Sequence, residues 1–134
     1  MLVSQDKARE IGLAKPVWVV ASELNSGRYM TGFRDMTTPE ITTRGAAEIW
    51  EMSGMGPGDI DVAEVHDAFT IAELLYYEAF GFCQRGEAVA LLESGATSLG
   101  GRIPVNPGGG LLCRGHPVGA TGAAQLVELT MQLR

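Results

Sequence analysis

The sequence has 134 residues, which is enough for one domain with a hydrophobic core but short for a complete enzyme. It is 46% hydrophobic and 19% charged, as in a soluble globular chain, and its net charge of −6 argues against nucleic-acid or anionic-membrane partners. No uncharged apolar run reaches the roughly 18 residues of a membrane span. Two cysteines make no disulfide framework, so we expect a reducing, cytoplasmic location.

The first residues of the chain have the pattern of the C-terminal part of a helix. Residues 1–15 are predicted to be the tail of a preceding helix or a linker, with a polar amphipathic pattern over 5–14 that ends near Gly12. Because the first part of this helical pattern is missing, we expect the chain to begin inside a larger protein. The apolar, β-branched run PVWVVAS (16–22) predicts a strand buried on both faces, and residues 23–36 predict a surface loop.

A helix is predicted to start after this loop. Thr38, Pro39 and Glu40 provide a capping hydroxyl, a proline for the first helical position and an acid for the first turn. The apolar positions then recur at helical spacing until Gly54, which predicts the end of the helix.

A second strand and helix follow. The segment DIDVAEVHDAF (59–69) predicts a strand that ends at His66 and Asp67. Thr70 and Glu73 have the spacing of a capping box, which predicts a helix that closes at Gly81. His66 would then lie at the carboxyl end of a strand, where open α/β sheets bind ligands.

The last part of the chain is predicted to be irregular over 86–105, with 103–105 as a short strand, and helical from Ala120. Ala123, Leu126, Val127, Thr130 and Met131 would form the buried stripe of this helix. The alternation of strands and helices predicts an α/β fold.

The stretch NPGGGLLCRGHPVGATG (106–122) is dense in glycine around His116 and leads into that helix. Glycines let backbone amides approach a ligand closely, and a helix start adds unpaired N–H donors. We therefore expect a place for a developing negative charge beside an imidazole that can act as a general base. His116 stands where a phosphate-binding loop has lysine, so a nucleotide site is not expected.

Other chemistry-bearing residues are predicted to be structural. Cys113 and His116 could be half of a zinc site, but no second pair with matching spacing exists, so no metal is expected. Cys83 and Cys113 are interpreted as buried or half-buried thiols rather than nucleophiles. Asp67 is interpreted as structural, and the carboxylates of Glu64, Glu73 and Glu78 as solvated or capping.

Three motifs in order, VHDAF (65–69), NPGGGL (106–111) and GHPVGATG (115–122), resemble the C-terminal half of thiolases. Within that superfamily they resemble the sterol-carrier-protein-type thiolases and their bacterial and archaeal relatives, which carry HD-x-F where other thiolases carry N-E-A-F. The resemblance implies a three-layer α/β/α thiolase C-terminal domain over 16–134. This domain would be incomplete at its C-terminus, since the last two strands of the family's sheet would lie beyond Arg134 and leave the stripe of 123–131 uncovered.

The resemblance also implies acyl transfer on 3-ketoacyl-CoA thioesters, by thiolytic cleavage or Claisen condensation, with coenzyme A as co-substrate and no bound cofactor. His116 would deprotonate a nucleophilic cysteine and donate toward the thioester oxygen. His66 would hold the same oxyanion, directly or through water, where other thiolases use asparagine. The pocket would be shaped by Gly108, Gly109, Gly110, Gly115, Gly119 and Gly122.

The family's nucleophile lies in the N-terminal half, and neither Cys83 nor Cys113 aligns with it. We therefore expect the isolated chain to be inactive and to need an N-terminal thiolase half or partner chain, in a homo-oligomer or hetero-complex that takes an acyl-CoA substrate. Two alternatives remain open. One is a thiolase-like aldolase of steroid side-chain degradation, and the other is a non-catalytic half that docks onto a partner chain.

Overall fold

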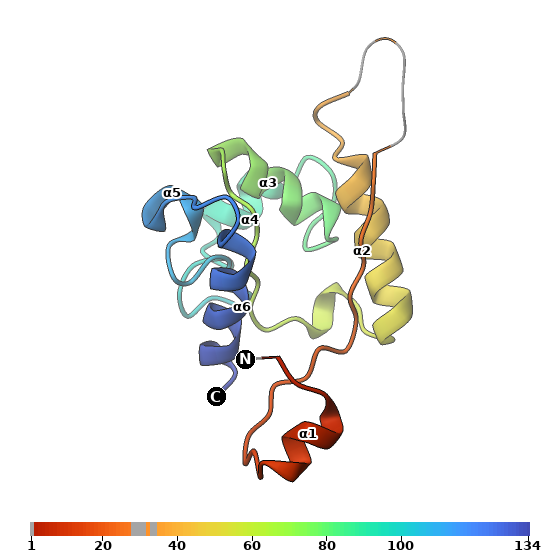
Figure 1. Cartoon of the computed structure of the whole chain (residues 1–134). Helices are drawn as coiled ribbons and strands as arrows, with labels where there is room; N and C mark the ends of the chain where they lie inside the picture. The colour runs from red at the N-terminus through yellow and green to blue at the C-terminus, as the bar shows by residue number, and fades with distance from the viewer. Residues whose placement is uncertain (1, 28–31, 33–34) are drawn as a thin grey trace.

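The computed structural model describes residues 2–27, 32 and 35–134 (Figure 1). Met1 and part of the predicted loop 23–36 lie outside the described residues. No helix in the described part is long and apolar enough to cross a bilayer. The elements are α1 (Gln5–Glu10), α2 (Glu40–Ser53), the 3-10 helix η1 (Pro57–Asp59), α3 (Thr70–Ala79), α4 (Ala88–Glu93), α5 (Gly110–Arg114) and α6 (Thr121–Gln132).

The predicted helices are confirmed at their C-terminal ends. Gly12, Gly54 and Gly81 have φ angles of 65°, 69° and 79°, a left-handed conformation that glycine adopts without steric cost. Gly54 also closes α2 through a backbone bond from its N–H to the carbonyl of Trp50. Figure 1 shows α1 apart from the other helices, and the extended segment that follows α1 runs alongside α2.

The predicted helix starts are less accurate. Pro39 is the N-cap of α2, and the Thr38 hydroxyl donates to Asp35 instead of capping the helix. The capping box of α3 is wrong, because the N-cap is Phe69 and no side chain caps it. The Glu73 carboxylate instead accepts hydrogen bonds from the side chains of Tyr77 and Asn106.

The predicted strands do not form among the described residues, where one isolated parallel bridge joins Ala63 to Val105. Residues 16–22 are extended but unpaired, and Trp18, Val19 and Val20 are half exposed or more. A strand buried on both faces is therefore wrong for this structure. The physical reason is that a strand needs a hydrogen-bonded neighbour, and no described segment pairs with 16–22.

The core lies between α3, α4 and the segments that meet at the Ala63–Val105 bridge. Val65, Tyr77, Phe82, Ala88, Ile103 and Val105 form its buried cluster. Burial raises the pKa of Tyr77, and the hydrogen bond from its hydroxyl to Glu73 raises it further. The Tyr77 ring is thus packed in the core while its hydroxyl has a hydrogen-bond partner, as buried tyrosines usually do.

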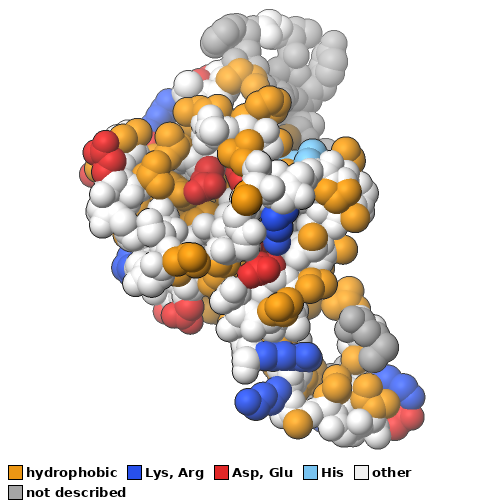
Figure 2. Space-filling model, turned by 90° about the vertical axis from the view of Figure 1, so that its left-hand side faces the viewer, with side chains coloured by type: hydrophobic (Ala, Val, Ile, Leu, Met, Phe, Trp, Pro, Cys, Tyr) orange, Lys and Arg blue, Asp and Glu red, His pale blue; other side chains and the backbone are white. Residues whose placement is uncertain are grey.

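Helix α6 carries its apolar face toward solvent. Leu126, Val127 and Met131 are 51%, 58% and 68% exposed. The burial expected from periodicity is therefore wrong for this chain, whereas the uncovered stripe that the resemblance implied is confirmed. The opposite face holds the buried Thr121 and contacts the core segment through Gln125. Figure 2 shows hydrophobic side chains spread over one face of the molecule, with a histidine among them at the surface.

The accessible surface of the chain is correspondingly large. It measures 9086 Å², whereas a compact monomer of 14.2 kDa would expose roughly 6,800 Å² by the usual scaling with mass. The excess of roughly 2,300 Å² includes the exposed apolar side chains of α6 and of the unpaired segment 16–22.

Candidate active site

The fold brings the two histidines together. Their ring centroids lie 4.7 Å apart with an interplanar angle of 83°, so one ring meets the other edge-on. His66 precedes α3, and His116 lies between α5 and α6. Both are exposed, which leaves them accessible to a substrate or to a group from another chain.

Thr121 fixes the orientation of His116. Its buried hydroxyl oxygen lies 2.7 Å from His116 Nδ1, and the hydroxyl donates to the Pro117 carbonyl at 3.3 Å. When the single hydroxyl proton points to the Pro117 carbonyl, the hydroxyl oxygen accepts from Nδ1–H. In the neutral imidazole the lone pair is then on Nε2, which is the arrangement a general base requires.

Side-chain hydrogen bonds, rather than the backbone bonds of a β-sheet, hold the segment that carries His66. Asn106 Oδ1 accepts from the Val65 amide at 2.9 Å, and Gln125 Nε2 donates to the Val65 carbonyl at 2.7 Å. On the other side of His66, the buried Asp67 accepts from the Leu111 amide at 2.7 Å. Both neighbours of His66 are therefore anchored, and Asp67 has the structural role that the sequence predicted.

Two of the predicted glycines are required by close approach. Gly110 has φ +60°, and a Cβ there would lie 2.1 Å from Asp67 Oδ2. Gly109 has φ +95°, and a Cβ there would lie 2.8 Å from the Cβ of Cys113. Gly110 lets α5 pack its first turn directly against the His66 segment, and Gly109 lets the chain enter α5 next to the Cys113 side chain.

The other predicted glycines have different surroundings. A Cβ on Gly108 would lie 2.9 Å from Glu128 Oε2, so this residue packs against an ion pair. Gly115 has φ +85°, while Gly119 and Gly122 have no atom within 4 Å of the position a Cβ would take. That these three residues shape a ligand pocket stays a prediction.

The cysteines differ from each other. Cys83 is half-buried beside the core, and burial raises the pKa of its thiol, which disfavours the thiolate needed for attack. Cys113 is exposed on α5, so the expectation of a buried or half-buried thiol is wrong for this residue.

The carboxylate of Glu64 is the main feature that the sequence reasoning missed. It was expected to be solvated or capping, but it accepts from Arg114 Nη2 at 2.6 Å and its side chain is 1% exposed. The only sequence signal was a charged Arg114 within a stretch of small and apolar residues. Thr121 was missed as well, although it stands inside the GHPVGATG motif.

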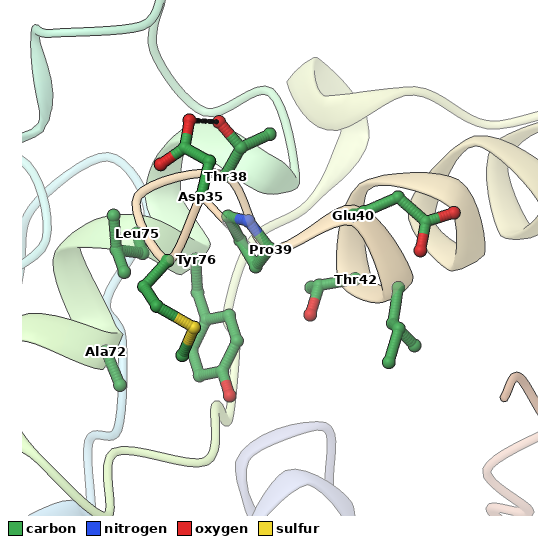
Figure 3. Close-up of a pocket in the computed structure, with 10 residues that line it drawn as sticks. Asp35, Thr38, Pro39, Glu40, Thr42, Ala72, Leu75 and Tyr76 are labelled. Atoms are coloured by element: carbon green, nitrogen blue, oxygen red, sulfur yellow. Dashed lines mark hydrogen bonds between the residues drawn. The ribbon is translucent and has the colours of Figure 1, made fainter. Parts of the chain in front are cut away.

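A separate cavity of ≈ 560 Å³ lies between the start of α2 and α3. Figure 3 shows Leu75 and Tyr76 of α3 on one side and Pro39 and Thr42 on the other. Its lining contains none of the predicted site residues. The cavity and the paired histidines are therefore two distinct features of the molecule.

Comparison with known proteins agrees with the motifs. Residues 22–134 match the model of the family described as thiolase C-terminal domain-like. The chain is 44% identical, over its whole length and 35% of the relative, to the benzoylsuccinyl-CoA thiolase subunit BbsB of Thauera aromatica. It is 45% identical, with the same coverage, to the acetyl-CoA acetyltransferase of Methanothermobacter thermautotrophicus. Rat sterol carrier protein 2 is 42% identical over 98% of the chain and 25% of its own length.

A solved structure is similar as well. The Ltp2-ChsH2(DUF35) aldolase superposes with a TM-score of 0.66 and 35% identity, covering 71% of this chain and 25% of the aldolase chain. The chain spans about a third of the length of the first two relatives. On the match over residues 22–134, the chain belongs to the thiolase C-terminal domain-like family.

Proposed function

We propose that this chain supplies two catalytic histidines to an enzyme that transfers acyl groups of 3-ketoacyl-CoA thioesters. The observation that carries the proposal is the edge-on contact of His66 and His116 at 4.7 Å, made by the HDAF and GHPVGATG motifs. The similarity to a thiolase subunit and an acetyl-CoA acetyltransferase supports it. Coenzyme A is the co-substrate that collects the shortened acyl group.

The two histidines would divide the chemistry. His116 Nε2 takes the proton of a cysteine thiol, and the thiolate attacks the 3-keto carbon. The carbon–carbon bond then breaks, and the departing thioester carbanion takes up the proton that His116 holds. Coenzyme A passes its thiol proton to His116 and attacks the acyl-cysteine, and the released cysteine thiolate takes this proton back to regenerate the thiol. His66 donates a hydrogen bond to the oxygen on which negative charge develops. Thr121 keeps His116 in the tautomer that this requires.

The cysteine would come from an N-terminal thiolase half, on a partner chain or in a longer form of the protein. The exposed stripe of α6 and the excess accessible surface support such a partner. In the assembled enzyme, 16–22 and 59–69 would become strands of the layered α/β/α arrangement. Two free thiols fit a reducing, cytoplasmic compartment, and assembly as a homo-oligomer or hetero-complex follows from the same surface.

The test is thiolysis of acetoacetyl-CoA and of a longer 3-ketoacyl-CoA, by this chain alone and mixed with the N-terminal half of a related thiolase. We expect activity only in the mixture. Activity of the isolated chain would contradict the assignment of the nucleophile to the other half. Absence of thiolysis in a folded mixture would contradict the acyltransferase and favour a docking role or a retro-aldol lyase. The similarity to the aldolase structure makes the lyase the second candidate.

The cysteines of this chain provide a second prediction. Cys83→Ser and Cys113→Ser should each leave the kcat of the assembled enzyme within a few-fold of the unmodified value, because neither thiol is the nucleophile. Steady-state thiolysis with circular dichroism as a folding control measures this. Loss of activity in a folded Cys113→Ser variant would make the exposed thiol of α5 the nucleophile instead.

A further inference from the structure

We propose that Arg114 is a positioning residue that holds the segments of His66 and His116 at a fixed distance from each other. Arg114 ends α5, two residues before His116, and its Nη2 atom lies 2.6 Å from Oε2 of Glu64. Glu64 itself lies two residues before His66. One ion pair therefore ties the approach to one histidine to the approach to the other.

A third group extends this contact to α6. Arg114 Nη1 lies 3.8 Å from Oε2 of Glu128, on the helix that also carries Thr121. The loop that bears His116 is thus held at its start by Arg114 and at its end by Thr121. Gly108 packs against the same ion pair, because a Cβ there would lie within 3.1 Å of atoms of both Glu128 and Arg114.

The ion pair is shielded from water, which makes it a specific contact rather than a loose surface pair. The side chains of Glu64, Arg114 and Glu128 are 1%, 26% and 19% exposed. Glu64 Oε1 is buried and has no hydrogen-bond partner among the described residues, so Arg114 is the group that compensates the Glu64 charge. Burial raises the pKa of Glu64, while the Arg114 guanidinium opposes this rise. Removing Arg114 leaves a buried carboxylate without a counter-charge.

The other contacts of the His66 segment do not perform this function. Asn106 and Gln125 bind the backbone of Val65, and Leu111 binds Asp67. They fix the segment to the core, to α6 and to the start of α5. Arg114 is the contact next to the His116 loop, so it sets the distance between the two rings.

The test uses the full chain, in which His66 and His116 are the only histidines. Their ring protons therefore give two sets of NMR signals, and the edge-on contact predicts nuclear Overhauser effects between them. In Arg114→Met we expect these effects to be lost. In Arg114→Lys, which keeps a cation for the Glu64 carboxylate, we expect them to be retained. Arg85→Met, which breaks an exposed ion pair with Asp35, is the matched control and should also retain them.

A double variant separates positioning from folding. Glu64→Gln combined with Arg114→Met removes both charges of the closest pair, and Glu128, which Arg114 contacts at 3.8 Å, keeps its hydrogen bond from Gln132. The proposal expects this variant to recover the circular dichroism of the helical fold but not the contact between the rings. If the contact is present in the folded double variant, or persists in Arg114→Met, the proposal is wrong. If both variants are unfolded, the pair serves folding as a whole and the positioning role is equally wrong.

The catalytic consequence rests on the proposed function and is measured separately. In the assembled enzyme, the folded double variant should lose kcat by at least tenfold with KM for the thioester within a few-fold, as misplacement of catalytic groups does. An inactive unmodified enzyme would contradict the proposed function while leaving the NMR result intact. If the double variant is active although its rings have separated, the contact between the rings is not needed for catalysis. That result would overturn the positioning role.

Discussion

His116→Ala is expected to lower kcat of the assembled enzyme by a factor on the order of 100 or more. The substitution removes the Nε2 lone pair that Thr121 exposes by engaging Nδ1. It also removes a donor close to the oxygen on which charge develops, and one such donor is typically worth about 3–4 kcal/mol of transition-state stabilisation. Thiolysis kinetics under saturating substrate measure the effect. A kcat within a few-fold of the unmodified value would contradict the assigned role.

His66→Asn is the informative companion variant. An asparagine amide keeps a hydrogen-bond donor at this position, so we expect kcat to fall by less than about tenfold, whereas His66→Ala should fall further. Asparagine at position 116 keeps no base, so His116→Asn should behave like His116→Ala. If the two histidines respond alike to asparagine, the division into a base and an oxyanion donor is wrong.

The helices could be predicted because their signals are local. Gly54 and Gly81 terminate α2 and α3 where the sequence indicated, through a backbone conformation that depends on the residue itself. The short helices α4 and α5 were missed, since neither has the length for a clear apolar period. The capping box of α3 failed because Glu73 is used by two long-range partners, Tyr77 and Asn106.

The strands could not be predicted from their composition alone. Residues 16–22 have the β-branched composition of a buried strand, yet a strand forms only beside another strand. The burial expected from the periodicity of α6 was wrong for a related reason. Its periodicity correctly identified an apolar face, but which surface covers that face depends on groups outside the sequence pattern.

The sequence predicted the two histidines of the candidate site but not the contacts that hold them in place. His66 and His116 follow from two short motifs, and the structure places their rings in contact. Their supports are Thr121, the Glu64–Arg114 ion pair and the Asp67–Leu111 hydrogen bond, and two of these join segments far apart in the chain. Single-sequence patterns have no signal for such pairs, because each residue alone resembles an ordinary surface polar group.

Gly110→Ala is expected to lower the free energy of unfolding by about 2–5 kcal/mol. One part is the cost of φ +60° for a residue with a Cβ, about 1–2 kcal/mol. The other part comes from Asp67, whose Oδ2 would lie 2.1 Å from the new Cβ and must move. Asp67 is buried, so its displacement breaks the bond to the Leu111 amide and leaves a charge unsatisfied, at about 1–3 kcal/mol.

Gly54→Ala separates the two parts of this cost. Gly54 has φ +69° but no atom within 4 Å of the position a Cβ would take, so its variant should show the backbone cost alone. Urea unfolding followed by circular dichroism at constant m-value measures both. In an Asp67→Ala background, Gly110→Ala should cost no more than Gly54→Ala, because the side chain that the methyl group displaces is gone. Equal losses for Gly110→Ala and Gly54→Ala in the unmodified background would mean that Asp67 can move freely. The anchor that holds His66 against α5 would then contribute nothing to stability.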